Sequence, residues 1–146
     1  MSFKNVVLVL VLVLVLFACV AVGCAKEEMI YMPALAQVIV VPQEFLGKTL
    51  QVKGYYAAVP PAESLLFLTK EHASVADRPS SIFLWQTADG KNFSSIAECR
   101  NGHLSVRGRF SELEFGGVGL TDIERAVVTR EGEESSRVCF EVPNRE

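Results

Sequence analysis

The first 25 residues say more about the location and the domain organisation of this protein than any other segment does. Lys4 is the only charged residue among them, and it precedes an unbroken apolar run from Val6 to Val22 that leads into Gly23-Cys24. A short positive region, a long apolar core and small residues before a cleavage point are typical of a secretory signal. The beginning of the chain therefore predicts export across a membrane.

The end of this run, Ala21-Val22-Gly23-Cys24, resembles the bacterial lipobox. In that motif a lipoprotein signal peptidase cuts before a cysteine whose thiol carries a diacylglycerol, so the resemblance implies that Cys24 is lipidated. The family usually has Leu where this chain has Ala21. The alternative site is Cys19, because Leu16-Phe17-Ala18-Cys19 has the Leu but places bulky Phe17 where a small or β-branched residue is usual.

These features divide the chain into a signal peptide over residues 1–23, a tether over 24–33 and a folded domain over 34–142. The alternative is an uncleaved anchor, since residues 6–25 form an uncharged run that would span roughly 30 Å as a helix. In both cases we expect the domain to be attached to a membrane and to face the periplasm. Ala25 is not the aspartate that in many lipoproteins signals retention in the inner membrane, so the outer membrane is favoured.

The charge of the exported part limits the class of partner. The chain has 14 basic and 17 acidic residues, and without Lys4 a formal charge of −4 remains. An acidic domain is a poor match for the phosphate backbone of nucleic acid. We therefore expect no nucleic-acid partner, and we expect contact with the membrane and with an envelope protein or a saccharide.

Two cysteines, Cys99 and Cys139, lie in the exported part, where thiols tend to be oxidised. A disulfide between them would close a loop of about 40 residues and contribute on the order of 3 to 4 kcal/mol to stability. The alternative is a pair of separate buried thiols. The sequence has no Cys-x-x-Cys, and His72 and His103 do not form ligand spacing with the cysteines. We expect neither a metal nor another cofactor.

Alternating polar and apolar residues predict a mainly β domain with one or two short helices. From Lys48 the period is two, with Leu50, Val52 and Gly54 on one face, which is typical of a half-buried strand. Further strands are expected at 64–69, 81–86, 103–110, 118–129 and 137–142, between turns such as Asp89-Gly90 and Asn101-Gly102. Residues 70–77 are expected to form a helical turn, and 34–41 fit either a helix or a strand.

Two of the predicted strands share a pattern. Gly47 to Tyr55 and Gly102 to Phe110 both have the order glycine, apolar residue, valine, basic residue, glycine and then an aromatic residue. A glycine inside a strand, here Gly54 or Gly108, is typical of a bulge or a sharp bend where backbones come close. Together with the Gly and Pro residues between the strands, the pattern predicts an antiparallel barrel of five to six strands.

At these residues the chain looks like the small bacterial OB-fold proteins, many of which are lipoproteins. The matching segments are Gly47 to Tyr55, Leu65 to Thr69, Ser81 to Trp85 and Asn101 to Phe110, within about residues 34–129. Their motifs consist of fold-forming residues and hold no catalytic group. The resemblance implies a five-stranded barrel with a binding face on the middle strands, but it implies no ligand, because one fold hosts many functions.

Basic and aromatic side chains interleave on the two glycine-marked strands. The candidate binding face consists of Lys53, Tyr55, Arg107 and Arg109, with Tyr56 and Phe110 beside them. Rings beside positive charges also suit single-stranded nucleic acid, which the net charge and the predicted export disfavour. The same residues could instead meet a sugar or an anionic peptide. The alternative is that Lys and Arg simply occupy solvent-facing strand positions and that Phe110 belongs to the core.

No catalytic residue is predicted. His72 and His103 stand alone, without a nucleophile pattern, and Trp85 is expected to pack in the core or at its rim. Six acidic residues could supply a pair of carboxylates: Asp77, Asp89, Glu112, Glu114, Asp122 and Glu124. The first hypothesis is therefore a non-catalytic binding or adaptor lipoprotein, and the alternative is a hydrolase that acts on envelope material through these acids.

Overall fold

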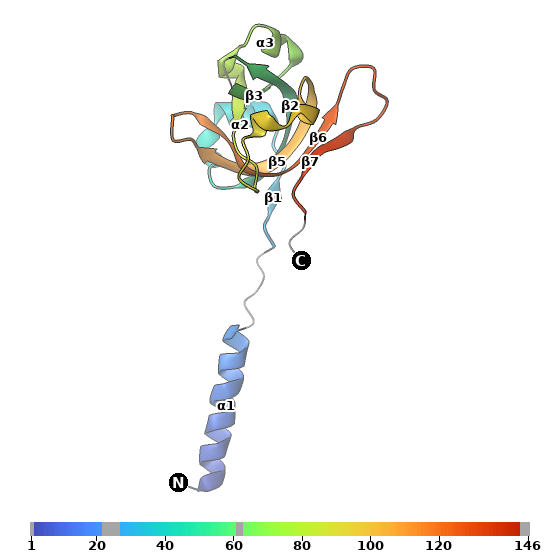
Figure 1. The fold of residues 1–146 in the computed structure, drawn as a ribbon. Coiled ribbons are helices and arrows are strands. Elements are labelled where there is room, and N and C mark those ends of the chain that lie inside the picture. Colours follow the sequence, from blue (N-terminus) through green and yellow to red (C-terminus); the bar gives the residue numbers. More distant parts are fainter. Residues whose placement is uncertain (1, 22–26, 61–62, 144–146) are drawn as a thin grey trace.

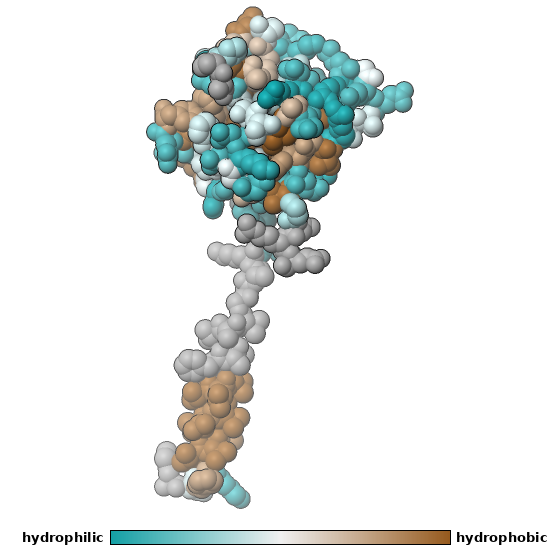
Figure 2. Space-filling model, viewed as in Figure 1, coloured by the Kyte–Doolittle hydropathy of each residue, from teal (hydrophilic) through white to brown (hydrophobic). Residues whose placement is uncertain are grey.

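The computed structural model describes residues 2–21, 27–60 and 63–143, and of residues 16–21 it describes the backbone only. The predicted cleavage and lipidation site at Cys24 lies outside these residues. Helix α1 (Phe3–Ala21) covers most of the predicted apolar signal core, and its apolar side chains up to Val15 are exposed (Figure 2). No helix within the described residues is both long enough and apolar enough to cross a membrane.

The rest of the described chain forms a mainly β domain (Figure 1). Its strands are β1 (Ile30–Tyr31), β2 (Thr49–Val59), β3 (Glu63–Phe67), β4 (Ser81–Leu84), β5 (Gly102–Glu112), β6 (Val118–Thr129) and β7 (Arg137–Glu141). Its helices are α2 (Leu35–Val40) and α3 (Lys70–Ser74), with 3-10 turns η1 (Pro42–Glu44), η2 (Arg78–Ser80), η3 (Phe93–Ser95) and η4 (Ala97–Cys99). The prediction of a mainly β fold with short helices is confirmed, and residues 35–40 form a helix.

The strands belong to one sheet of seven strands. Hydrogen-bonded pairings run from β2 to β3, β4, β6 and β5, and β5 also pairs with β2. β1 adds to β2, and β7 adds to β6. The predicted count of five to six strands is too low, because β1 has only two residues and gives no periodic signal.

The prediction of a purely antiparallel sheet is wrong. β4 runs parallel to β6, with Phe83 opposite Gly119 and Leu84 opposite Leu120, and β1 runs parallel to β2. A period of two tells which side chains face the core, but it carries no information on strand direction. The chain between β4 and β5 crosses to the other side of β6 before the β5–β6 hairpin begins, and this crossing makes β4 and β6 parallel.

The hydrophobic core lies between the inward faces of the strands. On β2 and β5, alternation buries Leu50, Val52, Tyr56, Leu104 and Val106, each at most 1% exposed. All core residues in the described part of the chain lie between positions 35 and 140, and α1 contributes none of them. The protein from residue 27 onward therefore contains its whole described core, and it does not need α1 to bury that core.

The two strand glycines lie where backbones come close, as predicted. A Cβ atom on Gly54 would lie 2.5 Å from the carbonyl oxygen of Phe67, and one on Gly108 would lie 2.9 Å from that of Thr121. The register of β5 against β6 also shifts between Arg107 and Arg109, next to Gly108. These positions therefore exclude any side chain unless the neighbouring strand moves.

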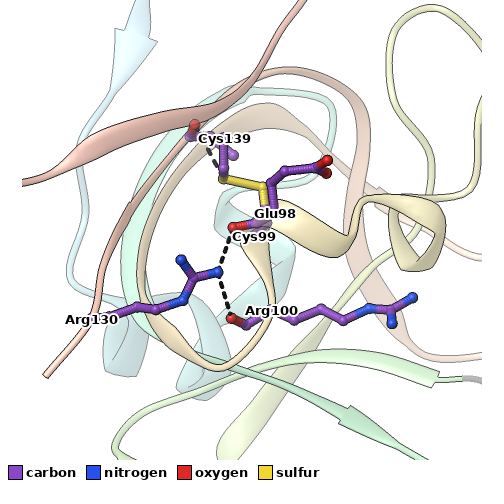
Figure 3. Close-up of a disulfide and its surroundings, with 6 residues drawn as sticks. Glu98, Cys99, Arg100, Arg130 and Cys139 are labelled. Carbon is purple, nitrogen blue, oxygen red and sulfur yellow. Dashed lines mark hydrogen bonds between the residues drawn. A yellow bond between two sulfur atoms is a disulfide. The ribbon is translucent and has the colours of Figure 1, made fainter.

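The predicted disulfide between Cys99 and Cys139 is confirmed (Figure 3). It joins η4 to β7, with 5.2 Å between the two Cα atoms. Arg130 holds the same segment from the end of β6, because its Nη2 atom donates to the carbonyl oxygens of Glu98 at 2.7 Å and Arg100 at 3.2 Å. Strand β7 is thus connected to the domain by pairing with β6 and by a covalent bond.

Candidate functional site

The structure brings the four residues of the predicted binding face onto one side of the β2–β5 pair. Lys53 and Tyr55 lie opposite Ser105 and His103, while Arg107 and Arg109 lie opposite Gln51 and Thr49. Residues directly opposite each other in an antiparallel pair share a face, and this face points away from the core. Lys53 and Arg109 are exposed, and Tyr55 and Arg107 are half-buried.

Tyr56 and Phe110, which adjoin the face in the sequence, point the other way. Both are fully buried in the core. The Tyr56 hydroxyl lies 3.0 Å from the Ser64 hydroxyl, and its ring packs against Phe93 at 5.4 Å between centroids. Burial raises the pKa of Tyr56, so this phenol is a neutral core group and offers no charge to a ligand.

A fourth basic residue joins the face from a third strand, β6. Arg125 lies directly opposite Arg107, and its Nε atom is 3.2 Å from a carboxylate oxygen of Glu141 on β7. Arg107 itself donates from Nη2 to the side-chain oxygen of Gln51 at 3.1 Å. The sequence does not identify Arg125 as part of this face. Alternation in 118–129 puts it on an outward position, but the sequence does not show that β6 lies beside β5.

A pocket of about 420 Å³ opens on this face between β2, β5 and β6. We call it the basic pocket. Its polar lining residues are Lys53, His103, Ser105, Arg125, Thr129 and Ser136, together with Gln51. The Thr129 and Ser136 hydroxyls are 2.6 Å apart, and the ring of His103 packs edge-on against Tyr55 at 5.3 Å between centroids. The lining therefore consists mostly of hydrogen-bond donors and hydroxyls.

A second pocket, of about 380 Å³, lies beside β3 and β4. We call it the aromatic pocket. Three rings gather there: Phe115 packs against Phe83 at 5.1 Å and against Trp85 at 4.8 Å between ring centroids. Trp85 is 40% exposed and Phe115 is 54% exposed. Phe115 comes from the hairpin between β5 and β6, which folds back over the end of β4.

Polar groups border the aromatic pocket. Glu63, Asn92 and Ser94 are among its lining residues, and the Glu63 carboxylate forms an ion pair with Arg78 at 2.5 Å. Trp85 lies at the rim of the core, as expected, but nothing in the sequence places it in a pocket. Its partner Phe115 is 30 positions further along the chain, and only the β5–β6 hairpin brings the two rings together.

The acidic residues of the alternative hydrolase hypothesis form no metal-ligand cluster in the part of the chain that the structure describes. No group of three or more His, Cys, Asp or Glu residues that could hold a metal occurs in the described ranges. Asp77 accepts a hydrogen bond from Ser80 at 2.7 Å. The Thr87 hydroxyl donates to Asp89 and lowers the pKa of that carboxyl, whereas a general acid at neutral pH needs a raised pKa.

The two histidines have separate surroundings. His72 lies in α3, where its Nδ1 atom is 2.8 Å from the Thr69 hydroxyl and its Nε2 atom is 3.9 Å from Asp77. His103 lies on the outward face of β5 at the edge of the basic pocket. His72 therefore belongs to the cap of a short helix, and the exposed His103 borders the basic pocket.

Comparison with known proteins adds no further residue to these sites. No protein-family model matches the chain, and neither a curated protein nor a solved structure matches it. The two pockets therefore supply the basis for a functional proposal.

Proposed function

We propose that this protein is an exported lipoprotein, anchored through a lipid on Cys24, whose OB-like barrel binds a saccharide without catalysis. Export is supported by the apolar run before Cys24. It is also supported by the disulfide between Cys99 and Cys139, because disulfides persist in oxidising compartments outside the cytosol. The anchor holds the domain at the periplasmic face of a membrane, with the outer membrane favoured by Ala25.

The OB-like barrel is supported by the strand pairings. They return from β5 to β2, and the last strand of the cycle, β6, lies parallel to β4. An OB-fold is a five-stranded, partly open Greek-key barrel that binds ligands on its middle strands and on the loops beside them. In this chain β3 and β4 take the place of these middle strands, and the hairpin that carries Phe115 is one of the adjacent loops.

The observation that carries the proposal is the aromatic pocket. Ligand pockets are lined mostly by apolar and aromatic side chains with a few polar groups that orient the ligand. Here Phe83, Trp85 and Phe115 supply the rings, and Asn92 and Ser94 supply polar groups. A sugar ring has one apolar face that can stack on Trp85 and hydroxyls that can bond to the polar border.

The single tryptophan of the chain makes this proposal testable by fluorescence, because Trp85 lies in the pocket. We expect soluble cell-wall oligosaccharides, added to the protein from residue 27 onward, to shift the Trp85 emission in a saturable way. Phe115→Ala should abolish the shift. Val138→Ala is the matched control, because Val138 is 46% exposed on β7, and it should bind normally. An emission that stays constant at saturating oligosaccharide would refute the saccharide ligand.

A further inference from the structure

The basic pocket points to a second ligand of different chemistry. We propose that it binds a phosphate-type oxyanion. This site shares no lining residue with the aromatic pocket, so the inference is independent of the saccharide proposal. The argument for it starts from the distribution of charge on the domain.

Positive charge is concentrated on one face of an otherwise acidic domain. The chain without Lys4 has a formal charge of −4, yet the outward face of β2, β5 and β6 carries Lys53, Arg107, Arg109 and Arg125. Of these four, Arg125 is paired with Glu141. Within the described residues, no ion pair joins Lys53 or Arg107 to a carboxylate. The net charge of the chain therefore does not describe the local potential at this pocket.

Two arginines occupy directly opposite positions on neighbouring strands. Arg107 and Arg125 are cross-strand partners, and like charges directly opposite each other destabilise a sheet. The Nε atom of Arg107 is buried and has no hydrogen-bond partner in the described part of the chain. Buried donors are normally satisfied, so Arg107 keeps a hydrogen-bond donor that the described residues leave unused. Arg107 does not itself line the basic pocket, but an anion bound there beside its cross-strand partner Arg125 would offset the repulsion between the two guanidinium groups.

The lining of the pocket matches the chemistry of an oxyanion. Lys53 and Arg125 provide charged donors, and Ser105, Thr129 and Ser136 provide hydroxyls. Charge-assisted hydrogen bonds from such groups to phosphate are stronger than neutral ones. The described residues that line the pocket include no Asp or Glu. A volume of about 420 Å³ exceeds that of a phosphate group, and leaves room for the organic group attached to it.

Glu141 controls how far Arg125 is available. Its carboxylate oxygen lies 3.2 Å from Arg125 Nε, so a bound oxyanion competes with Glu141 for the same guanidinium. Replacement of Glu141 by Gln removes the competing charge and should strengthen binding. Replacement of Lys53 by Gln removes a donor and should weaken it. These two substitutions predict opposite effects at one site.

The first experiment uses pyrophosphate as the probe and backbone amide NMR as the readout, on the protein from residue 27 onward. We expect saturable shifts at His103, Ser105 and Thr129. Lys53→Gln should weaken binding on the order of tenfold, and Glu141→Gln should tighten it. Lys91→Gln is the matched control, because Lys91 lies 69% exposed beside Asp89 and does not line the pocket. Non-saturable shifts, or equal weakening by Lys91→Gln, would overturn the proposal.

A second experiment separates the two sources of such a group, a lipid headgroup and a soluble phosphate. Vesicles of phosphatidylglycerol, but not of phosphatidylcholine, should sediment the protein if the ligand is a headgroup, and Lys53→Gln should prevent this. Binding of soluble glycerol phosphate without sedimentation would assign the site to a soluble phosphate ester. If the protein binds neither phosphatidylglycerol vesicles nor glycerol phosphate, the proposed oxyanion site is refuted. The saccharide proposal is tested separately by Trp85 fluorescence and does not depend on either outcome.

Discussion

Gly119 lies opposite Phe83 where β6 pairs in parallel with β4. A Cβ atom on Gly119 would overlap the carbonyl oxygen of Phe83 and would lie 2.7 Å from its Cβ atom. The missing side chain lets the two strands meet, and the parallel pair in turn holds the Phe83 ring against Phe115 in the aromatic pocket. Gly119 is therefore needed both for the pairing of β4 with β6 and for the position of the Phe83 ring in the aromatic pocket.

Gly119→Ala should therefore destabilise the domain. We expect a loss of about 2 kcal/mol in the free energy of unfolding, because the new methyl group forces β4 and β6 apart. Urea unfolding of the protein from residue 27 onward measures this change. Ala58→Val, which adds bulk at an exposed position of β2, is the control and should change stability by less than about 0.5 kcal/mol. Equal midpoints for the two variants would show that the strands can move apart without cost.

Arg130 stabilises η4 through hydrogen bonds, and their contribution to stability can be measured. Its Nη2 atom bonds to the carbonyl oxygens of Glu98 and Arg100, on either side of Cys99 (Figure 3). Arg130→Met keeps much of the apolar stem and removes both hydrogen bonds, and we expect a loss of about 1 to 3 kcal/mol. Arg78→Met, which removes an ion pair with Glu63 whose arginine side chain is 51% exposed, should cost less. A larger effect at Arg78 would contradict this ranking.

The disulfide should contribute more than these hydrogen bonds do. Its two cysteines are 40 positions apart, and cross-linking a loop of that length lowers the entropy of the unfolded chain, worth on the order of 3 to 4 kcal/mol. The double variant Cys99→Ala with Cys139→Ala should lose this amount in urea unfolding. A reducing agent should lower the stability of the original protein and leave the variant unchanged. Mass spectrometry that finds two free thiols in the purified protein would disprove the pairing in solution.

The sequence predicts those features that depend on local pattern or on elimination. Cys99 and Cys139 can be paired from the sequence because no other cysteine follows Cys24. Gly54 and Gly108 can be recognised because each lies inside a strand pattern with a period of two. Strand direction could not be predicted, since alternation is the same for a parallel and an antiparallel neighbour. For that reason Gly119, which matters through the parallel strand β4, gave no signal.

The candidate sites also combine features that a local sequence pattern predicts with features that depend on strand pairing. Lys53, Tyr55, Arg107 and Arg109 are predicted as a binding face because basic and aromatic residues interleave on two strands, and the register of β2 against β5 brings these four onto one side. The aromatic pocket cannot be predicted from the sequence, because Trp85 and Phe115 belong to segments that are far apart in the chain. Arg125 was missed in the same way, since its relation to Arg107 exists only through the β5–β6 register. Residues that share one face of a single strand can be grouped from the sequence. Residues of different strands can be grouped only when the strand pairing is known.

The proposed lipid anchor on Cys24 can be tested in cells. Cells grown with radioactive palmitate should label the protein, and Cys24→Ala should abolish the label because the acylated thiol is lost. Cys19→Ala is the matched control, since Cys19 lies in the preceding apolar run, and it should leave the label in place. Loss of label with Cys19→Ala instead would move the cleavage site five residues upstream. An unlabelled protein that keeps residues 1–23 in the membrane fraction would replace the lipid by an uncleaved anchor, because the apolar run alone would then attach the domain.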